Sequence, residues 1–150
     1  LPPGTYTLRV ELAGFATRGD AGADIGVHVY GGTLKELFAN AAFSMFDIIA
    51  DLEGLKEPVS MDIKLSAPNS DELLVAWLDE LLYNFCTKSI IFSRFEIEEL
   101  SDTAIKAKVF GRNVGDNRNR LKTEIKAITY SGLAIKESKD GFKVDIIFDV

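Results

Sequence analysis

Two aspartates occupy the positions in this sequence that most suggest chemistry. Asp24 interrupts a stretch of small and apolar residues at positions 20–26, directly before a run with the alternation of a buried strand. Its carboxylate could cap a turn through a local hydrogen bond, or it could offer oxygen ligands to a cation. The local sequence alone favours the turn and leaves the cation site open.

The second aspartate, Asp149, ends an alternating run at positions 142–150. No polar tail follows Val150, so the terminal carboxylate is expected to lie beside the Asp149 side chain. Two neighbouring negative charges are unfavourable unless solvent or a cation neutralises them. Hard oxygen ligands of this kind suit Ca²⁺ or Mg²⁺ better than zinc. A solvated chain end is the alternative.

Basic residues gather between positions 104 and 126, where only Asp116 and Glu124 are acidic. The basic residues are Lys106, Lys108, Arg112, Arg118, Arg120, Lys122 and Lys126. In a chain with a net charge of −6, such a local excess could face RNA phosphates or an acidic partner surface. It could equally be a solvated strand face and loop.

The usual catalytic signatures are missing. The sequence has one histidine, His28, and no nucleophile elbow, phosphate loop, zinc-spaced cluster or dinucleotide fingerprint. Gly31, Gly32 and Thr33 open a helical pattern, which favours a turn and helix cap over an anion site. An independent hydrolase is therefore disfavoured, because no general base or nucleophile has an orienting partner.

Composition indicates an ordinary folded domain. The chain has 150 residues, 47% of them hydrophobic and 27% charged, which predicts a single domain over residues 1–150. Its negative charge argues against strong unaided binding to nucleic acid. We expect no membrane segment, and the N-terminal residues do not resemble a signal peptide. The single cysteine, Cys86, favours a cytoplasmic protein, and its apolar helical surroundings predict a buried thiol.

Hydrophobic periodicity predicts an α+β fold in the order β-β-α-β-α-β-β-β-β. Thr33 with Glu36 forms a capping box for the first amphipathic helix, and Ser70 is expected to cap the second. We expect both helices to pack on one face of a mixed or antiparallel sheet, as a two-layer single domain. The predicted strands cover residues 5–12, 25–30, 59–65, 90–100, 104–110, 123–136 and 142–150.

Several segments, taken in their order along the chain, carry a resemblance to a known protein family. They are Ala23-Asp24-Ile25-Gly26, Thr33-Leu34-Lys35-Glu36-Leu37-Phe38, Ala41-Ala42, Met45-Phe46-Asp47, Trp77-Leu78-Asp79-Glu80-Leu81-Leu82-Tyr83, Phe92-Ser93-Arg94-Phe95, Leu121-Lys122-Thr123-Glu124-Ile125-Lys126-Ala127-Ile128-Thr129-Tyr130 and Phe148-Asp149-Val150. Each segment is weak alone, but the ordered set is specific. The chain therefore resembles the archeases over nearly its whole length, from about residue 20 to 150.

The resemblance implies a non-catalytic, metal-binding accessory protein of the RtcB-type tRNA-splicing ligase. Archeases promote guanylylation and repeated turnover of that ligase, so RNA would be reached through it, in tRNA splicing or RNA repair. The family's metal site corresponds here to Asp24, Asp149 and Val150. Calcium is the expected cation, with Mg²⁺ or Mn²⁺ as alternatives. A chaperone-like binding module for RNA-processing proteins, without metal dependence, is the alternative function.

Basic residues complete the site implied by the resemblance. The family's lysine in the Glu-x-Lys-Ala stretch corresponds to Lys126, and Lys122 and Arg120 are expected to contact the ligase or RNA with it. Two departures from the family pattern concern histidines. Ala21 and Gly22 stand where the family usually has His-Thr, and Ser131 replaces a histidine of many members. Both remove side chains near the expected site but leave the carboxylates.

Overall fold

The strands form two antiparallel sheets. The structure is a computed structural model and describes residues 11–13, 24–130 and 132–150. One sheet has the order β1-β2-β8-β6, with β7 also pairing β8, and the other has the order β3-β5-β4. The strands are β1 (Glu11–Ala13), β2 (Asp24–Gly31), β3 (Val59–Ser66), β4 (Ile90–Leu100), β5 (Ala104–Asn113), β6 (Ala127–Thr129), β7 (Lys136–Ser138) and β8 (Gly141–Asp149).

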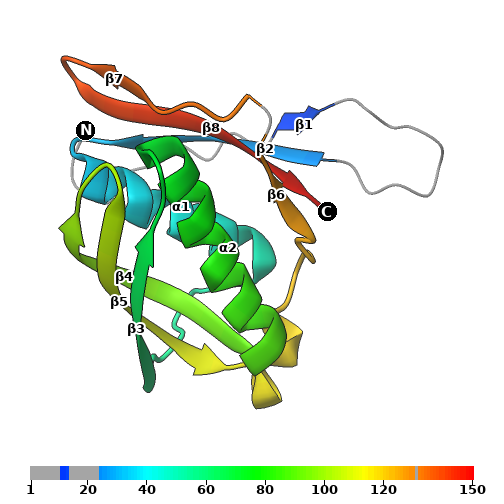
Figure 1. The fold of residues 1–150 in the computed structure, drawn as a ribbon. Coiled ribbons are helices and arrows are strands. Elements are labelled where there is room, and N and C mark those ends of the chain that lie inside the picture. Colours follow the sequence, from blue (N-terminus) through cyan, green and yellow to red (C-terminus); the bar gives the residue numbers. More distant parts are fainter. Residues whose placement is uncertain (1–10, 14–23, 131) are drawn as a thin grey trace.

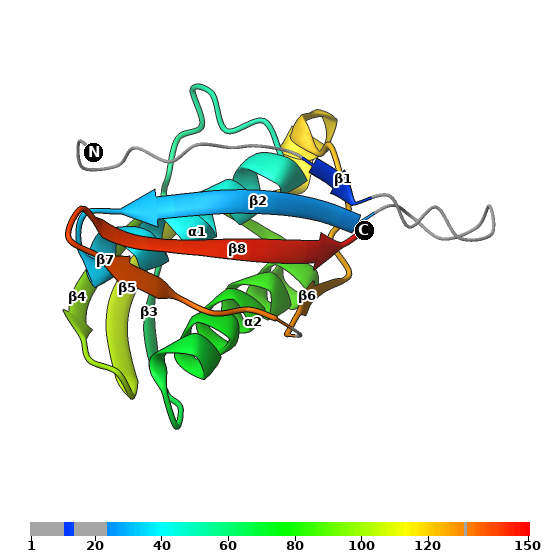
Figure 2. The same cartoon turned by 90° about the horizontal axis from the view of Figure 1, so that it is seen from above.

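Two helices, α1 (Leu34–Ile49) and α2 (Ser70–Lys88), lie between the sheets (Figure 1). Helix α1 contacts β2 and β8 on one side and β4 on the other. Helix α2 packs on α1 and contacts all three strands of the smaller sheet as well as β6. Seen from above, β2 and β8 run side by side across the helices (Figure 2).

The predicted α+β class is confirmed, with antiparallel sheets and two packed helices. The arrangement differs from the expected two layers, because two sheets rather than one cover the helices. The width of the apolar surface of α1 explains the difference. Phe38 and Met45 are fully buried, and so are residues around most of the helix, whereas one sheet covers only one side.

The helix starts follow from short polar side chains. Thr33 Oγ1 accepts a hydrogen bond from the Glu36 amide at 3.1 Å, and Glu36 Oε2 accepts one from the Gly32 amide at 2.9 Å. The predicted start of α1 is therefore confirmed. The cap of α2 is Asn69 rather than Ser70, because Asn69 Oδ1 accepts from the Glu72 amide at 2.9 Å.

Aromatic side chains join the helices to the smaller sheet. Trp77 of α2 is fully buried and donates from Nε1 to the carbonyl of Phe38 in α1 at 2.9 Å. Phe46 packs edge-to-face on Phe92 of β4, with ring centroids 5.5 Å apart. Satisfying the indole N–H inside the core avoids the cost of burying a polar group. The helices are thus held in a fixed position beneath the strands that carry the candidate site.

Two local predictions were wrong. The strand expected over residues 123–136 is reduced to β6 and β7, with Gly132 between them at a φ of 78°. Cys86 is exposed rather than buried, and so are the neighbouring residues up to 89 at the end of α2. The reason is that the helix extends past the core there, so an apolar pattern no longer implies burial. The first predicted strand lies mostly outside the described residues, apart from β1.

Candidate functional site

The register of β2 and β8 brings Asp24 and Asp149 to one end of the larger sheet. Ile25 pairs with Phe148, and the antiparallel register continued by one residue places Asp24 opposite Asp149. Directly opposed residues have Cβ atoms about 4.5–5.5 Å apart. The two predicted metal ligands, 125 residues apart in sequence, are therefore neighbours, and we call this pair the acidic corner.

Both aspartates face away from the core, as strand alternation requires. Val27 and Phe148, on the opposite face, are buried, whereas Asp24 is half-buried and Asp149 is exposed. Like charges placed directly across a strand pair are destabilising. Farther along the same face, His28 Nδ1 lies 2.5 Å from Asp145 Oδ1, so that carboxylate has a basic partner. The acidic corner instead gathers two acids.

Lys126 also lies at the acidic corner. Its backbone amide donates to the carbonyl of Asp149 at 2.7 Å, directly before the Ala127–Asp149 pair that starts β6. The Lys126 side chain is exposed, and Val150 is half-buried against the core. The structure therefore brings together four predicted site residues: Asp24, Asp149, Val150 and Lys126.

The oxygen atoms at the acidic corner are suited to a hard cation but provide few ligands. Among residues 11–13, 24–130 and 132–150, no three His, Cys, Asp or Glu side chains converge on one point. Calcium takes six to eight oxygen ligands, with water and backbone carbonyls often among them. Asp24, Asp149 and the Val150 backbone could therefore supply only part of such a shell. Ala21, Gly22 and Ser131 lie outside the described residues.

The other two predicted contact residues lie farther along the same segment. Lys122 is exposed, and its amide donates to the carbonyl of Ile49 at 2.8 Å. Arg120 Nη1 donates to the carbonyls of Asp51 and Glu53, at 3.1 and 2.7 Å. The extended segment at 121–126 therefore joins the acidic corner to the loop that follows α1, rather than gathering all three basic residues at the corner.

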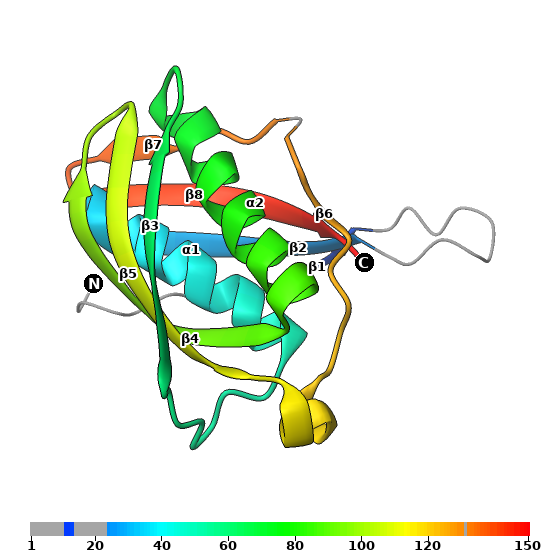
Figure 3. The same ribbon diagram turned by 60° about the horizontal axis from the view of Figure 1, so that its bottom comes forward.

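A basic pocket of about 310 Å³ opens around Arg120. Its lining comes from the loop after α1, from β5 and from η1 (Gly115–Arg120), a short 3₁₀-helix that follows β5. Figure 3 shows the loop after α1 and η1 at the same end of the ribbon. The pocket is lined by Gly54, Leu55, Lys56, Arg112, Asn117 and Arg120. Sequence reasoning included Arg112 and Arg120 in a basic stretch but missed Lys56. No local signal could have found Lys56, because it is an isolated lysine 56 residues before Arg112.

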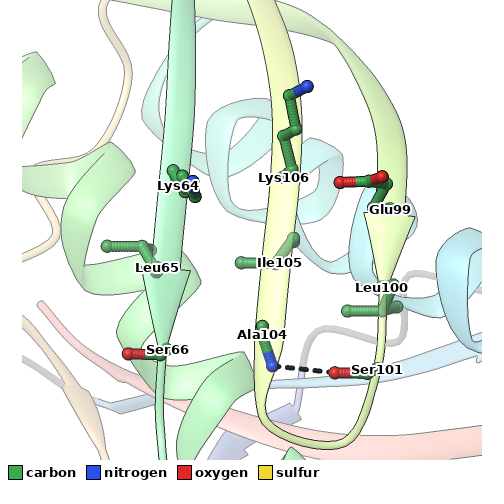
Figure 4. A pocket seen from close by; sticks show the side chains of 9 residues that line it. All are labelled: Lys64, Leu65, Ser66, Glu99, Leu100, Ser101, Ala104, Ile105 and Lys106. Carbon is green, nitrogen blue, oxygen red and sulfur yellow. Dashed lines mark hydrogen bonds between the residues drawn. The ribbon is translucent and has the colours of Figure 1, made fainter.

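A different pocket, of about 460 Å³, lies at the open end of the smaller sheet (Figure 4). Lys106 stands between Lys64 and Glu99 on its neighbouring strands, and the Ala104 amide donates to Ser101 Oγ at 3.1 Å. Lys106 belongs to the basic stretch noted in the sequence, but none of the six residues predicted for the metal or ligase site lines this pocket.

Tyr130 ties the segment after β6 to α2. Its hydroxyl donates to Asp79 Oδ2 at 2.5 Å, although the tyrosine is 63% exposed. The pKa of Tyr130 is raised above its ordinary value of 10.0, first by this hydrogen bond, then by partial burial, then by the charge of Asp79. All three effects disfavour the tyrosinate. The contact helps to fix β6, which flanks the acidic corner.

Comparisons with known proteins identify a family. Residues 17–150 match the model of the Archease protein family (MTH1598/TM1083). The chain belongs to the archease family. It is 38% identical to protein archease of Methanosarcina acetivorans over 132 residues, which cover 85% of this chain and 90% of that protein. The archease of Pyrococcus furiosus is 33% identical over 122 residues, covering 79% and 86%.

A solved archease-like structure has the same fold. The solution structure of Methanobacterium thermoautotrophicum protein 1598 aligns with a TM-score of 0.73 and 30% identity. The alignment covers 87% of this chain and 95% of that one. Membership of the archease family is consistent with an accessory, non-catalytic role. In the described part of this archease-family chain, neither helix is long and apolar enough to cross a membrane.

Proposed function

We propose that this archease-family protein is a metal-binding activator of an RtcB-type RNA ligase in the cytoplasm. It promotes guanylylation and multiple turnover of the ligase in tRNA splicing or RNA repair. The protein does not join RNA itself and reaches RNA through the ligase. The observation that carries the proposal is the strand register that sets Asp24 opposite Asp149 in a chain of this family.

The proposed cation site consists of the Asp24 and Asp149 carboxylates and the backbone oxygens of Val150. A bound Ca²⁺, or Mg²⁺ or Mn²⁺ in its place, would neutralise the two acids and leave coordination positions open to a partner. Val150 is held by packing against the core, and Asp149 by the Lys126 amide. These contacts hold the backbone that carries the Asp149 carboxylate before a cation arrives, which reduces the entropy lost on binding.

The ligase is expected to meet this corner and the basic segment beside it. Lys126 supplies positive charge next to the acids, and Lys122 and Arg120 extend it along the segment toward the basic pocket. Surface charge of this kind orients an approaching partner and speeds association more than it strengthens the final complex. Lys126, Lys122 and Arg120 are therefore proposed contacts for the ligase, or for RNA held by the ligase.

Multiple-turnover RNA ligation with the partner ligase tests the proposal. The double variant Asp24→Asn with Asp149→Asn is expected to lower stimulation by about tenfold or more, the usual loss when a metal site is disturbed. Asp145→Asn is the matched control, because it removes one carboxylate from the same strand face four residue pairs away. It should stimulate like the unchanged protein.

The alternative function predicts a different pattern. A chaperone-like module that stabilises RNA-processing proteins needs no metal, so a chelator and changes at Asp149 would leave its stimulation intact. Full stimulation by the double variant would contradict the metal site. Loss of stimulation with the double variant, together with recovery of the chelated wild-type protein by added Ca²⁺, would support it.

A further inference from the structure

We propose that the basic pocket around Arg120 binds a phosphate group, carried either by an RNA strand or by a free nucleotide. Three cationic side chains, Lys56, Arg112 and Arg120, line this one pocket of about 310 Å³. They come from three separate parts of the chain: the loop after α1, β5 and η1. Nothing in the proposed metal site requires their convergence, so it calls for its own explanation.

The acidic side chains that the structure describes do not neutralise the charges in the basic pocket. Among those side chains, which do not include Asp116, no carboxylate oxygen lies within 4.0 Å of Lys56, Arg112 or Arg120. Arg120 uses Nη1 to bind two backbone carbonyls, which carry no net charge. Like charges that share a site repel one another until an anion binds between them. The pocket therefore favours an anionic ligand.

Two other cations on the same sheet are paired with acids. Arg94 of β4 contacts both Glu57 and Glu96 and stacks 3.7 Å above the ring of Phe110. Lys108 of β5 lies 4.0 Å from Asp62. Arg112 stands on the same face of β5 as Lys108 but has no such partner among the described residues. Lys64 and Lys106 of the same sheet also have no carboxylate within 4.0 Å among the described side chains, so the pocket is distinguished by the convergence of three such cations rather than by the lack of an acid alone.

Nearby acids are directed elsewhere. Asp47, Asp51, Glu53 and Glu57 line a separate pocket of about 440 Å³, which meets the basic pocket only at Gly54 and Leu55. Asp51 Oδ1 accepts from the Glu53 amide at 3.1 Å, and Glu57 accepts from Ser93 at 2.5 Å as well as from Arg94. The loop after α1 therefore keeps acidic and basic side chains apart.

The lining suits phosphate. Guanidinium groups form paired hydrogen bonds with phosphate oxygens, and a lysine adds a compact charge. Arg112, Asn117 and Arg120 are half-buried, which limits screening by water, while Lys56 is exposed at the rim. The amide of Asn117 is held near the carbonyl of Asn113 at 3.5 Å, and its oxygen can accept from a ribose hydroxyl. The volume is at the lower end for ligand pockets and fits one nucleotide unit.

This inference rests on the proposed function for its setting, because Arg120 is also a proposed contact for the ligase or RNA. Binding of phosphate is nevertheless a property of this chain alone. The test therefore uses the purified protein without ligase, and its failure would leave ligase activation untouched. Loss of activation in the Asp24 and Asp149 variants would likewise say nothing about the basic pocket.

Fluorescence anisotropy with a short labelled single-stranded RNA is the first measurement, with GTP and inorganic phosphate as competitors. We expect Arg112→Gln to weaken RNA binding about tenfold through the loss of one charge-assisted contact. The salt dependence of its log affinity should fall by about 0.7, the value for one phosphate contact with a single strand. Lys56→Gln should act in the same direction.

Lys108→Gln is the matched control, because it removes the same charge from the same strand face outside the pocket. It should change affinity less than about twofold, as expected for a distant surface charge. A loss equal to that of Arg112→Gln would mean that only overall charge matters and would overturn the proposal. Displacement by GTP at concentrations near the RNA affinity would identify a free nucleotide as the source of the phosphate, and weak displacement would identify RNA.

Amide NMR shifts provide the second measurement. Titration with inorganic phosphate should move the amide signals of residues 54–56, 112 and 117–120 and leave those of β8 unchanged. Signal shifts spread evenly over the protein would overturn the proposal of a phosphate pocket. Displacement of RNA by an acidic peptide as effective as that by phosphate would also overturn it. An unchanged circular dichroism spectrum of Arg112→Gln would exclude a folding defect as the cause of weaker binding.

Discussion

The acidic corner and the basic pocket each gather like charges, but by different structural means. At the acidic corner, the register of two long paired strands sets Asp24 opposite Asp149. At the basic pocket, an irregular loop and a short 3₁₀-helix bring Lys56, Arg112 and Arg120 together. The first arrangement is as rigid as the sheet that carries it. The second depends on side-chain contacts that hold the loop.

This difference predicts how each site fails. The acidic corner should be lost only when the strands that carry it are disturbed, and a conservative change of one acid should leave the fold intact. The basic pocket should loosen when the contacts of Arg120 with the loop are removed. Binding of cation and of phosphate should consequently be separable by mutation.

The largest effect is expected from Phe148→Ala beside the acidic corner. Phe148 is fully buried and is the inward-facing neighbour of Asp149. Its truncation should lower the free energy of unfolding by about 3–5 kcal/mol, as for other buried phenylalanines. Equilibrium urea denaturation measures the change. Lys143→Ala, exposed on the same strand, should cost less than about 0.5 kcal/mol, and similar losses for both would contradict a corner anchored by the core.

An intermediate effect is expected at the basic pocket. Arg120→Ala removes hydrogen bonds to the carbonyls of Asp51 and Glu53 and should cost about 1–2 kcal/mol, because bonds from a charged donor are strong but this one is partly solvated. The measurement is again urea denaturation. Lys122→Ala, two residues away and exposed, should be nearly neutral. If Arg120→Ala leaves the free energy of unfolding unchanged, the loop does not depend on this contact.

A smaller effect of opposite sign is expected from Asp149→Asn at the acidic corner. In the presence of a chelator, the change removes repulsion from Asp24 and should raise the free energy of unfolding by about 0.2–1 kcal/mol. With Ca²⁺ added, the unchanged protein should gain thermal stability that the variant does not gain. Differential scanning calorimetry tests both. Asp145→Asn should show no such gain in chelator, because Asp145 contacts His28.

The smallest effect concerns Tyr130, which supports the β6 side of the acidic corner. Its folded-state pKa is raised by the hydrogen bond to Asp79, partial burial and the charge of Asp79. The resulting stability is fully present below the unfolded value of 10.0 and is lost as pH rises through the higher folded value. A tyrosinate absorbance titration compared with Tyr130→Phe should show one tyrosine ionising late. If the titration of Asp79→Asn is the same as that of the unchanged protein, the contact between Tyr130 and Asp79 does not raise the pKa.

Much of the fold could be predicted from the sequence, because the signals that specify it are local. The capping box at Thr33 and Glu36 and the apolar stripe of α1 predict a helix without knowledge of its partners. Alternation along 142–150 likewise predicts β8. The number of sheets could not be predicted in this way, because strand pairing depends on contacts between residues distant in sequence. The exposed Cys86 shows the same limit, since a helical pattern does not reveal where the core ends.

The same distinction between local signals and distant contacts applies to the two charged sites. The sequence is enough to place Asp24 and Asp149 at the ends of alternating strands, because alternation is a local property with a period of two residues. Their position opposite each other depends on the antiparallel register of β2 and β8, which no local pattern contains. The approach of Lys56 to Arg112 likewise depends on the fold, because the position of a loop is set by what it packs against rather than by its own sequence.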